Sequence, residues 1–451
     1  MQPKLSFSSY LVIGVMLFAL FFGAGNLIFP AQLGQYAGSN LWLAIIGFLI
    51  TGVGLPFLGV LAMGFSGSQN LQDLATRIHP VYAVIFTSLL YLTIGPFFAA
   101  PRTGAVAYDI GIAPFIAEDY TKIGLLIFTL LFFGLTLWLS LNPAKIVDNV
   151  GKILSPGIII LLIGLLVMAI VNPIGAIGSP QDVYADGAFM KGFTEGYNTM
   201  DALAALVFGI IVINVLRSMG VTSKRGILAA TAKTGAVATA FLALIYVGIA
   251  YLGATSVEKF GLFDTGGPVL SEAAAHYLGT FGLVLLAIVI ILACLTTAIG
   301  LVTACGEYFH TLIPKVSYKM FVIIFTVFCF VVANFGLANI ITYSIPVLMF
   351  LYPLAVVLML LTFTSPLFKH ARPVYVAATI VAFLISTVDG LKTLCQLLEI
   401  DYFGWLAPII TFYENVLPLY KDGLGWLLPV LVVMLITGVI ARLTHTETVQ
   451  S

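Results

Sequence analysis

Long apolar stretches, separated by short polar segments, follow one another along almost the whole chain. A helix that spans a membrane needs roughly 20 mostly apolar residues, and many of these stretches reach that length. The apolar residues run on continuously instead of alternating with polar ones, which favours helices over the strands of a membrane β-barrel. The pattern predicts about twelve spans, at residues 8–35, 40–63, 81–101, 123–141, 151–172, 192–215, 226–253, 279–308, 318–337, 339–363, 373–390 and 424–442.

Two of the predicted spans contain residues that interrupt a helix. The first carries FFGAGNLIFP, residues 21–30, and the sixth carries KGFTEGYNTMDALAALVFG, residues 191–209. Interrupted helices in matching positions of two halves are typical of inverted repeats in membrane proteins. Because the two interruptions lie five spans apart, we expect an all-α polytopic membrane protein with a five-plus-five inverted repeat followed by two additional helices.

The composition supports one membrane domain over residues 1–451. Hydrophobic residues make up 61% and charged residues 8% of the chain, whereas soluble domains carry about 25% charged residues. Within this domain we expect a first repeat at 1–172, a second at 192–363 and the two additional helices at 373–442. A signal peptide is the alternative for the first span, since Lys4 precedes it; its apolar character continues past Pro30, which favours a retained helix.

Charge predicts orientation and excludes several function classes. Most of the 19 Lys and Arg residues fall on the side that carries both termini, so we expect both termini in the cytoplasm and the chain in the cell (inner) membrane. The formal net charge is zero and no basic region points to nucleic acid. The sequence has no GxxxxGK[ST] motif, so no ATPase activity or ATPase subunit is implied. No nucleophile–base pair or metal-ligand spacing indicates an enzyme, and the four cysteines are expected to be buried apolar residues.

The interruption in the first span predicts a binding site. Backbone groups in lipid must be satisfied, so a broken helix survives where it is buried or lines a cavity. The N–H end of one half-helix attracts an anion, and the carbonyl end of the other attracts a cation. A zwitterion such as an α-amino acid suits both ends, and Gly23 and Gly25 allow close approach of a carboxylate. A kinked structural helix, with glycines for close packing, is the alternative.

The eighth span contains two hydroxyls at a spacing that suits a small cation. Thr296 and Thr297 follow Ala293 by three and four residues, which places both hydroxyls over the Ala293 carbonyl in a helix. Neutral oxygens of this kind are ligands for hard cations. Carbonyls near Ala19 and Phe22, just before the glycines, are the candidates for further ligands. Threonines that only hydrogen-bond back to their own helix are the alternative.

Two charged residues near the spans leave two interpretations each. Asp201 either caps the half-helix that follows Asn198 and Thr199 or takes up a proton, and we favour the cap. Arg102 either anchors its helix at the membrane interface or pairs with a gate, and we favour the anchor. Glu307 lies near the cytoplasmic end of the eighth span, where we expect it to be solvated.

Four segments together resemble the branched-chain amino acid:cation symporters, the BrnQ-type carriers of bacteria. They are FALFFGAGNLIFP, GPFFAAPRTGAVAYD, GYNTMDALAALVFG and CLTTAIGL, and the resemblance covers nearly the whole chain. It implies the LeuT-type fold class and uptake of leucine, isoleucine and valine with a sodium or proton gradient, without an organic cofactor. It also implies substrate-binding residues at the two interruptions, Gly23, Ala24, Gly25, Asn26, Tyr197, Asn198 and Thr199. The implied sodium site is formed by Ala19, Phe22, Ala293, Thr296 and Thr297.

The sequence therefore predicts a sodium-coupled carrier that works by alternating access. A proton-coupled carrier of the same fold, with Asp201 or Glu307 exchanging the proton, is the first alternative. A carrier of another small neutral amino acid, such as alanine, is the second. A passive channel or a sensor is disfavoured, because the spans hold few polar residues and no soluble output domain is apparent.

Overall fold

The computed structural model describes residues 6–141 and 146–444, and these two ranges are helical with no β-strand. Within them, eight helical stretches are long and apolar enough to cross a membrane, and four shorter apolar helices accompany them. Each predicted span coincides with a helix or with helices joined across an interruption. The prediction of an all-α polytopic membrane protein is confirmed.

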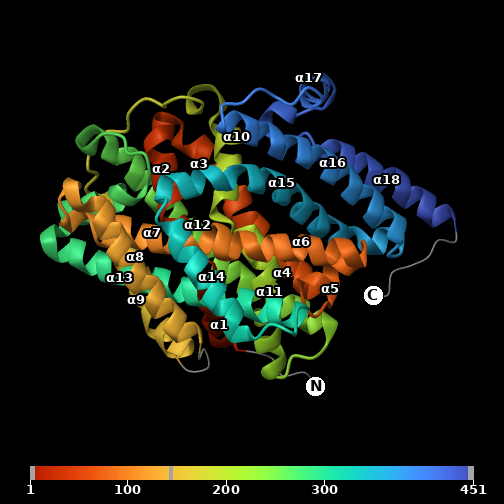
Figure 1. Cartoon of the computed structure of the whole chain (residues 1–451), viewed down its shortest axis with the longest axis horizontal. Coiled ribbons are helices and arrows are strands. Elements are labelled where there is room, and N and C mark those ends of the chain that lie inside the picture. Colours follow the sequence, from red (N-terminus) through yellow and green to blue (C-terminus); the bar gives the residue numbers. More distant parts are fainter. Residues whose placement is uncertain (1–5, 142–145, 445–451) are drawn as a thin grey trace.

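The helices of the first half run from α1 to α9 (Figure 1). They are α1 (Phe7–Phe21), α2 (Ala24–Ala37), α3 (Leu41–Leu49), α4 (Leu55–Ser66), α5 (Leu71–Thr76), α6 (Pro80–Leu92), α7 (Ala99–Gly111), α8 (Thr121–Ser140) and α9 (Ile146–Val171). The second half and the additional helices comprise α10 (Tyr184–Glu195), α11 (Asp201–Ser218), α12 (Lys224–Phe260), α13 (Gly267–Leu312), α14 (Tyr318–Ala333), α15 (Leu337–Thr364), α16 (Arg372–Leu397), α17 (Leu406–Val416) and α18 (Leu427–Leu443).

Both predicted interruptions are present. The first span breaks between α1 and α2, where Phe22 and Gly23 adopt extended backbone angles. The sixth span breaks between α10 and α11, which are separated by the 3₁₀ segment Gly196–Thr199 and by Met200 in a left-handed conformation (φ 63°). Only a few per cent of non-glycine residues have positive φ, so Met200 is held there by its surroundings.

Two further spans are interrupted in ways that the hydropathy pattern did not predict. The second span contains a π-helical segment, Ile50–Gly54, between α3 and α4. The third contains another, Thr93–Phe97, between α6 and α7, in which Gly95 leaves the helical region. Single π-helical turns occur mostly inside α-helices and frequently at functional sites. The pair Gly95–Pro96 was the available signal for the second of these interruptions.

The packing of the two halves matches an inverted repeat. The broken first span, α1 and α2, packs along α12, and the broken sixth span, α10 and α11, packs against α3 and α4. Thus each broken span lies against the second span of the opposite half, as a two-fold exchange of the halves requires. The third and eighth spans, α7 and α13, pack against each other. We propose residues 1–172 and 192–363 as the two repeats.

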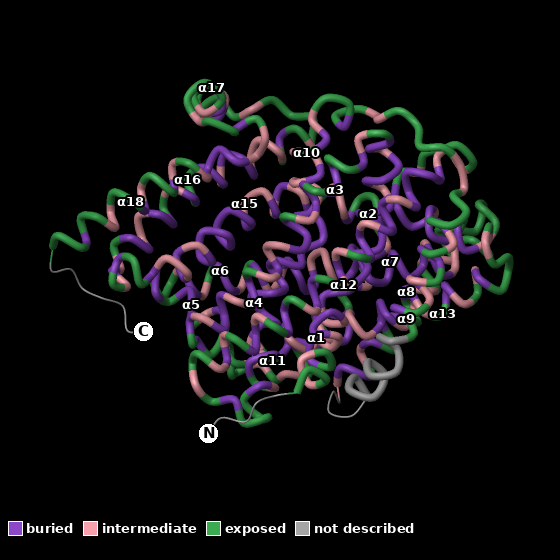
Figure 2. Tube along the Cα trace, turned by 180° about the vertical axis from the view of Figure 1, so that it is seen from behind, coloured by how far each residue is buried: buried purple, intermediate pink, exposed green. Residues whose placement is uncertain are grey.

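The remaining helices surround this centre. In Figure 1, α8 and α9 lie on one side and the additional helices α16 and α18 on the other, with α16 packed on α15. Figure 2 shows buried residues along the inner faces of the helices and exposed ones along the outer faces. Many exposed residues are large and apolar, such as Ile160, Val171, Leu435 and Leu443, which suits an outer surface that faces lipid. All four cysteines are buried, as predicted.

The contact between α2 and α12 depends on glycine. A Cβ atom on Gly34 would lie 1.9 Å from the Ala250 carbonyl oxygen, and one on Gly253 would lie 2.2 Å from the Ala31 carbonyl oxygen. The two backbones therefore touch, as small residues allow in membrane helix packing. This contact holds the second half of the broken first span against the opposite repeat.

We expect Gly34→Ala to lower the free energy of unfolding by about 1–3 kcal/mol, because the methyl group forces two backbones apart. Thermal unfolding of the detergent-purified protein measures this. Gly134→Ala in α8 is the matched control, since a Cβ there meets nothing within 4 Å and alanine favours a helix. Equal stability of the two variants would contradict the close contact.

Candidate functional site

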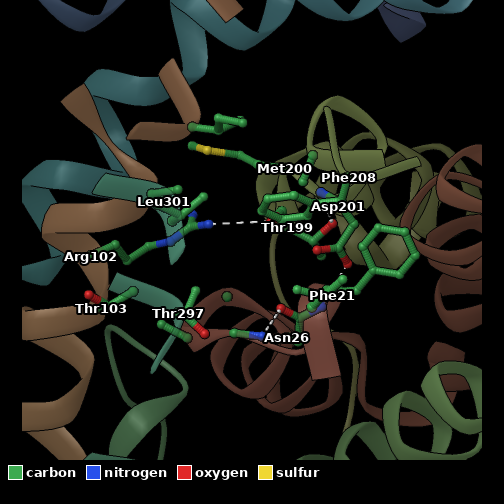
Figure 3. Close-up of a pocket in the computed structure, with 17 residues that line it drawn as sticks. Phe21, Asn26, Arg102, Thr103, Thr199, Met200, Asp201, Phe208, Thr297 and Leu301 are labelled. Atoms are coloured by element: carbon green, nitrogen blue, oxygen red, sulfur yellow. Dashed lines mark hydrogen bonds between the residues drawn. The ribbon is translucent and has the colours of Figure 1, made fainter. Parts of the chain in front are cut away.

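The two interruptions face a cavity of about 40 Å³ (Figure 3). The first span contributes Gly23 to Asn26, and the sixth contributes Thr199, Met200 and Asp201. The third span adds Arg102 and Thr103, and the eighth adds Thr297 and Leu301. The cavity therefore joins the four spans that the repeat architecture brings to the centre.

The start of α2 presents backbone N–H groups to this cavity. The first N–H groups of a helix have no partner within the helix and form its positive end. The side chain of Asn26 turns back and accepts a hydrogen bond from the N–H of Gly23 (2.9 Å). Ala24 and Gly25, the first two residues of α2, both line the cavity. The predicted residues of the first span thus lie together at the site.

Asn26, Asp201 and Tyr246 form a buried hydrogen-bonded group that connects three helices. The amide nitrogen of Asn26 donates to Asp201 Oδ2 (2.6 Å) and also to the hydroxyl of Tyr246. That hydroxyl donates to the same carboxylate oxygen (2.8 Å). All three residues are at least 97% buried. The group ties the first span to the sixth and both to α12.

Asp201 was expected to cap α11, and the structure corrects this. Asp201 is the first residue of α11, and the capping position is occupied by Met200, which makes no side-chain cap bond. The carboxylate instead accepts hydrogen bonds from two other helices. The carboxylate bonds to these donors and not to the N–H groups of its own helix, because packing brings Asn26 and Tyr246 to it.

The three predicted residues of the sixth span have different positions. Thr199 lines the cavity, donates to the Gly196 carbonyl (2.9 Å) and accepts from the N–H of Asp201 (3.3 Å). Tyr197 instead stacks on Tyr352 of α15, with ring centroids 4.1 Å apart. The side chain of Asn198 donates to Glu195 (2.7 Å), whereas its backbone carbonyl accepts a hydrogen bond from Arg102.

Arg102 was expected at the membrane interface, and this prediction is wrong. Its side chain is 98% buried; it donates to the backbone carbonyl of Asn198 (2.8 Å) and makes a longer contact with that of Thr199 (3.4 Å). Its guanidinium lies over the ring of Phe29, 5.1 Å from the centroid. The third span does not end at residue 101, because α7 continues after the π-helical segment to Gly111. Arg102 therefore lies inside the molecule.

The predicted cation ligands of the eighth span lie on one face of α13. Thr296 and Thr297 both donate to the Ala293 carbonyl, at 2.9 and 3.1 Å, so two hydroxyls and one carbonyl are adjacent. Thr297 also contacts the break, since a Cβ on Gly23 would lie 3.3 Å from Thr297 Cγ2. Ala19 and Phe22 lie at the C-terminal end of α1, next to the same break. Among the described residues, no cluster of three His, Cys, Asp or Glu side chains could hold a metal ion.

Sequence reasoning missed Tyr246 and Phe29. Tyr246 lies in the middle of the apolar α12, and no local pattern distinguished it from the other tyrosines of the chain. Phe29 follows Asn26 by three residues, a helical spacing that places both near the start of α2. That spacing was a usable signal once the break was recognised.

Comparisons with known proteins agree with this architecture. A sequence profile described as branched-chain amino acid transport protein matches residues 6–444. The chain is 49% identical to the branched-chain amino acid permease BrnQ of Bacillus subtilis, over 95% of this chain and 96% of that protein. It is 48% identical to the permease BraB of the same organism (95% and 94% covered) and 38% identical to BrnQ of Escherichia coli K12 (98% and 97% covered).

Solved structures show the fold. The structure of MhsT in complex with L-phenylalanine matches with a TM-score of 0.56 and 17% identity, over 98% of this chain and 99% of that one. The inward-facing conformation of Mhp1 matches with a TM-score of 0.59 and 14% identity, over 96% and 90%. The LeuT-type fold predicted from the sequence is confirmed.

We expect Tyr246→Phe to lower the free energy of unfolding by about 1–3 kcal/mol, because it removes a hydrogen bond to a buried carboxylate. Tyr375→Phe is the control: Tyr375 is also fully buried, but its hydroxyl has no hydrogen-bond partner among the described residues. Removal of the Tyr375 hydroxyl should change the free energy of unfolding by less than about 0.5 kcal/mol. Thermal unfolding of both variants measures the difference, and equal values would argue against the Asn26–Asp201–Tyr246 group.

Proposed function

The chain belongs to the family of branched-chain amino acid transport proteins, and we propose that it imports leucine, isoleucine and valine by symport with sodium ions. Proteins of this family are transporters and not enzymes. The family and the apolar helices make the chain a multi-pass membrane protein. The choice of the cell (inner) membrane with cytoplasmic termini, and of sodium as the coupling ion, belongs to the proposal.

One observation carries the proposed substrate class: the cavity is lined by two buried side chains of opposite charge, Arg102 and Asp201. In Figure 3, Arg102 and Asp201 enter the cavity from different sides, and the start of α2 lies beneath them. Buried charges are stable only when paired, so a ligand with one charge of each sign suits this site. An α-amino acid carries one ammonium group and one carboxylate group.

The rest of the cavity supports an aliphatic side chain on that amino acid. Its apolar lining comes from all four spans and includes Leu20, Phe21, Ile94, Phe208 and Leu301. Such a surface favours leucine, isoleucine and valine over polar amino acids, but one methylene distinguishes among them by only about 1–3 kcal/mol. We therefore expect similar affinities for the three.

The size of the cavity supports a conformational change during transport. At about 40 Å³ it has room for roughly three ordered waters, which is less than a leucine needs. Binding therefore requires the broken spans to separate from the third and eighth spans. Alternating access is a movement of this kind, in which the two repeats rock about the central site.

The position of Thr297 supports coupling to a cation. An ion that binds the Ala293 carbonyl, the two threonine hydroxyls and the carbonyl end of α1 would bridge the eighth span and the broken first span. It would stabilise one arrangement of these spans over the other, which is how binding energy drives a conformational equilibrium. Sodium, a hard cation, fits these neutral oxygens.

A proton-coupled carrier is the second candidate, and the burial of Asp201 favours it. A carboxylate inside a membrane protein is a frequent proton carrier. Asp201, at the start of α11, hydrogen-bonds to Asn26 and so links the two broken spans. Glu307, the other carboxylate considered, is exposed on α13 and is not in the cavity lining.

Uptake of labelled leucine into proteoliposomes tests the coupling ion. We expect an inward sodium gradient to drive accumulation at equal pH on both sides, and a proton gradient of the same size to drive none without sodium. Accumulation driven by protons alone would refute sodium coupling and assign the coupling to a carboxylate, which Asp201→Asn would then abolish. Unlabelled isoleucine and valine should compete for uptake, and stronger competition by alanine would overturn the proposed substrate class.

Thr297→Ala tests the cation site. We expect the sodium concentration for half-maximal uptake to rise about tenfold, which corresponds to a loss of about 1.4 kcal/mol of binding. Thr311→Ala is the matched control, because Thr311 donates to a carbonyl of the same helix at 2.9 Å but lies outside the cavity. An unchanged sodium dependence in the Thr297 variant would remove this residue from the ion site.

A further inference from the structure

We propose that Arg102 binds the α-carboxylate of the transported amino acid through the Nε–Nη2 edge of its guanidinium group. This inference rests on the proposed function and assigns to Arg102 the recognition of one end of the substrate. Four observations support it: the burial of the side chain, its incomplete set of hydrogen bonds, its position at the start of α2 and its separation from Asp201.

The guanidinium is buried but incompletely bonded. It carries five N–H donors in one plane. Nη1 donates to the Asn198 carbonyl at 2.8 Å, whereas the contact of Nη2 with the Thr199 carbonyl is 3.4 Å, beyond the usual hydrogen-bond range. Nε has no hydrogen-bond partner among the described residues. One edge of the group, formed by Nε and Nη2, is therefore left without strong acceptors inside the protein.

That edge has the geometry that carboxylates recognise. Two parallel N–H groups of a guanidinium bind the two oxygens of a carboxylate in a bidentate pair, which is stronger and more specific than a single hydrogen bond. The bond from Nη1 to Asn198 and the ring of Phe29, 5.1 Å away, hold the plane of the guanidinium in place. A carboxylate in the cavity can thus replace the weak Thr199 contact while the Asn198 bond remains.

The start of α2 reinforces the attraction for an anion. A Cβ atom on Gly25 would lie 2.9 Å from Nη2 of Arg102, so the guanidinium lies directly against the start of the helix. The unpaired N–H groups at this helix end carry a partial positive charge. The positive helix end and the arginine therefore lie side by side at the cavity.

No carboxylate of the described residues neutralises Arg102 directly. Asp201 is the other charged residue that lines the cavity. The two form no ion pair within 4.0 Å; in the described structure the only ion pairs are Lys191–Glu195 and Lys392–Glu414. Asp201 instead uses Oδ2 to bind Asn26 and Tyr246. The substrate carboxylate therefore supplies the counter-charge, and Asp201 remains available to face the ammonium group.

The test compares leucine with L-leucinol, which keeps the ammonium group and the side chain but lacks the carboxylate. Both compete with labelled leucine for the purified full-length protein in detergent, and the ratio of their inhibition constants is measured. We expect Arg102→Gln to weaken leucine binding about 10- to 100-fold, as removal of a charged hydrogen bond does, and leucinol binding less than about threefold. Arg102→Lys, which keeps the charge without the fork, should give an intermediate ratio.

Arg77→Gln is the matched control. Arg77 is also a buried arginine that donates to a backbone carbonyl, Ser66 at 2.8 Å, but it does not line the cavity. Its ratio of leucine to leucinol affinity should equal that of the unaltered protein.

Three results for Arg102→Gln would overturn the assignment. The first is an equal loss of affinity for leucine and leucinol, and the second is unchanged leucine binding. The third is loss of binding of both ligands although Arg102→Gln is as stable as Arg77→Gln. Failure of the proposed function would look different, because the unaltered protein would then prefer another amino acid. The same comparison with that amino acid and its amino alcohol would still test Arg102.

Discussion

The structure depends on one constraint: a backbone polar group inside a membrane must find a partner within the protein. The first and sixth spans both violate helical hydrogen bonding, at Gly23 and at Met200. Side chains bond to the freed groups: Asn26 accepts from the N–H of Gly23, and Arg102 donates to the backbone carbonyl of Asn198. The arrangement of the central spans follows from the need to bring these partners to the breaks.

The same groups that satisfy the breaks also create the site. Asn26 serves the first break through its oxygen and Asp201 of the sixth span through its nitrogen. Arg102 serves the sixth break and lies against Gly25 of the first. Each broken span is thus held by groups that also contact the other, so a ligand that displaces one contact affects both. This mutual dependence is a physical route by which binding can shift the position of a whole repeat.

Two interruptions outside the broken pair extend this arrangement. The π-helical segments in the second and third spans release some helical hydrogen bonds next to the centre. In the second span, Thr51 donates to the carbonyl of Phe193 at the end of α10 (2.7 Å). In the third, the helix is interrupted at Gly95, and α7 after the interruption places Arg102 at the cavity. Three of these four irregular spans line the cavity, and the second span supports the sixth through Thr51.

The sequence alone determined the class, the fold and the location of the centre. Apolar runs of spanning length, the breakers at Gly23–Gly25 and Gly196–Asp201, and the threonine pair after Ala293 are local patterns, and each acts within one helix. The family motifs, which are also contiguous, led to the LeuT-type fold. Interactions between residues close in the sequence can be predicted from the sequence, because helix geometry determines which residues share a face.

Only the tertiary structure decided the roles of Arg102, Asp201 and Tyr246. The hydrogen bond between Tyr246 and Asp201 joins residues 45 positions apart, and that between Asn26 and Asp201 joins residues 175 positions apart. From sequence, Asp201 was an N-terminal helix residue that could cap locally, and Arg102 was a cation after an apolar run that could reach the interface. Packing placed hydrogen-bond partners from other helices beside both residues. In a low-dielectric interior, these partners determine the role of a buried charged side chain more than its position along the helix does.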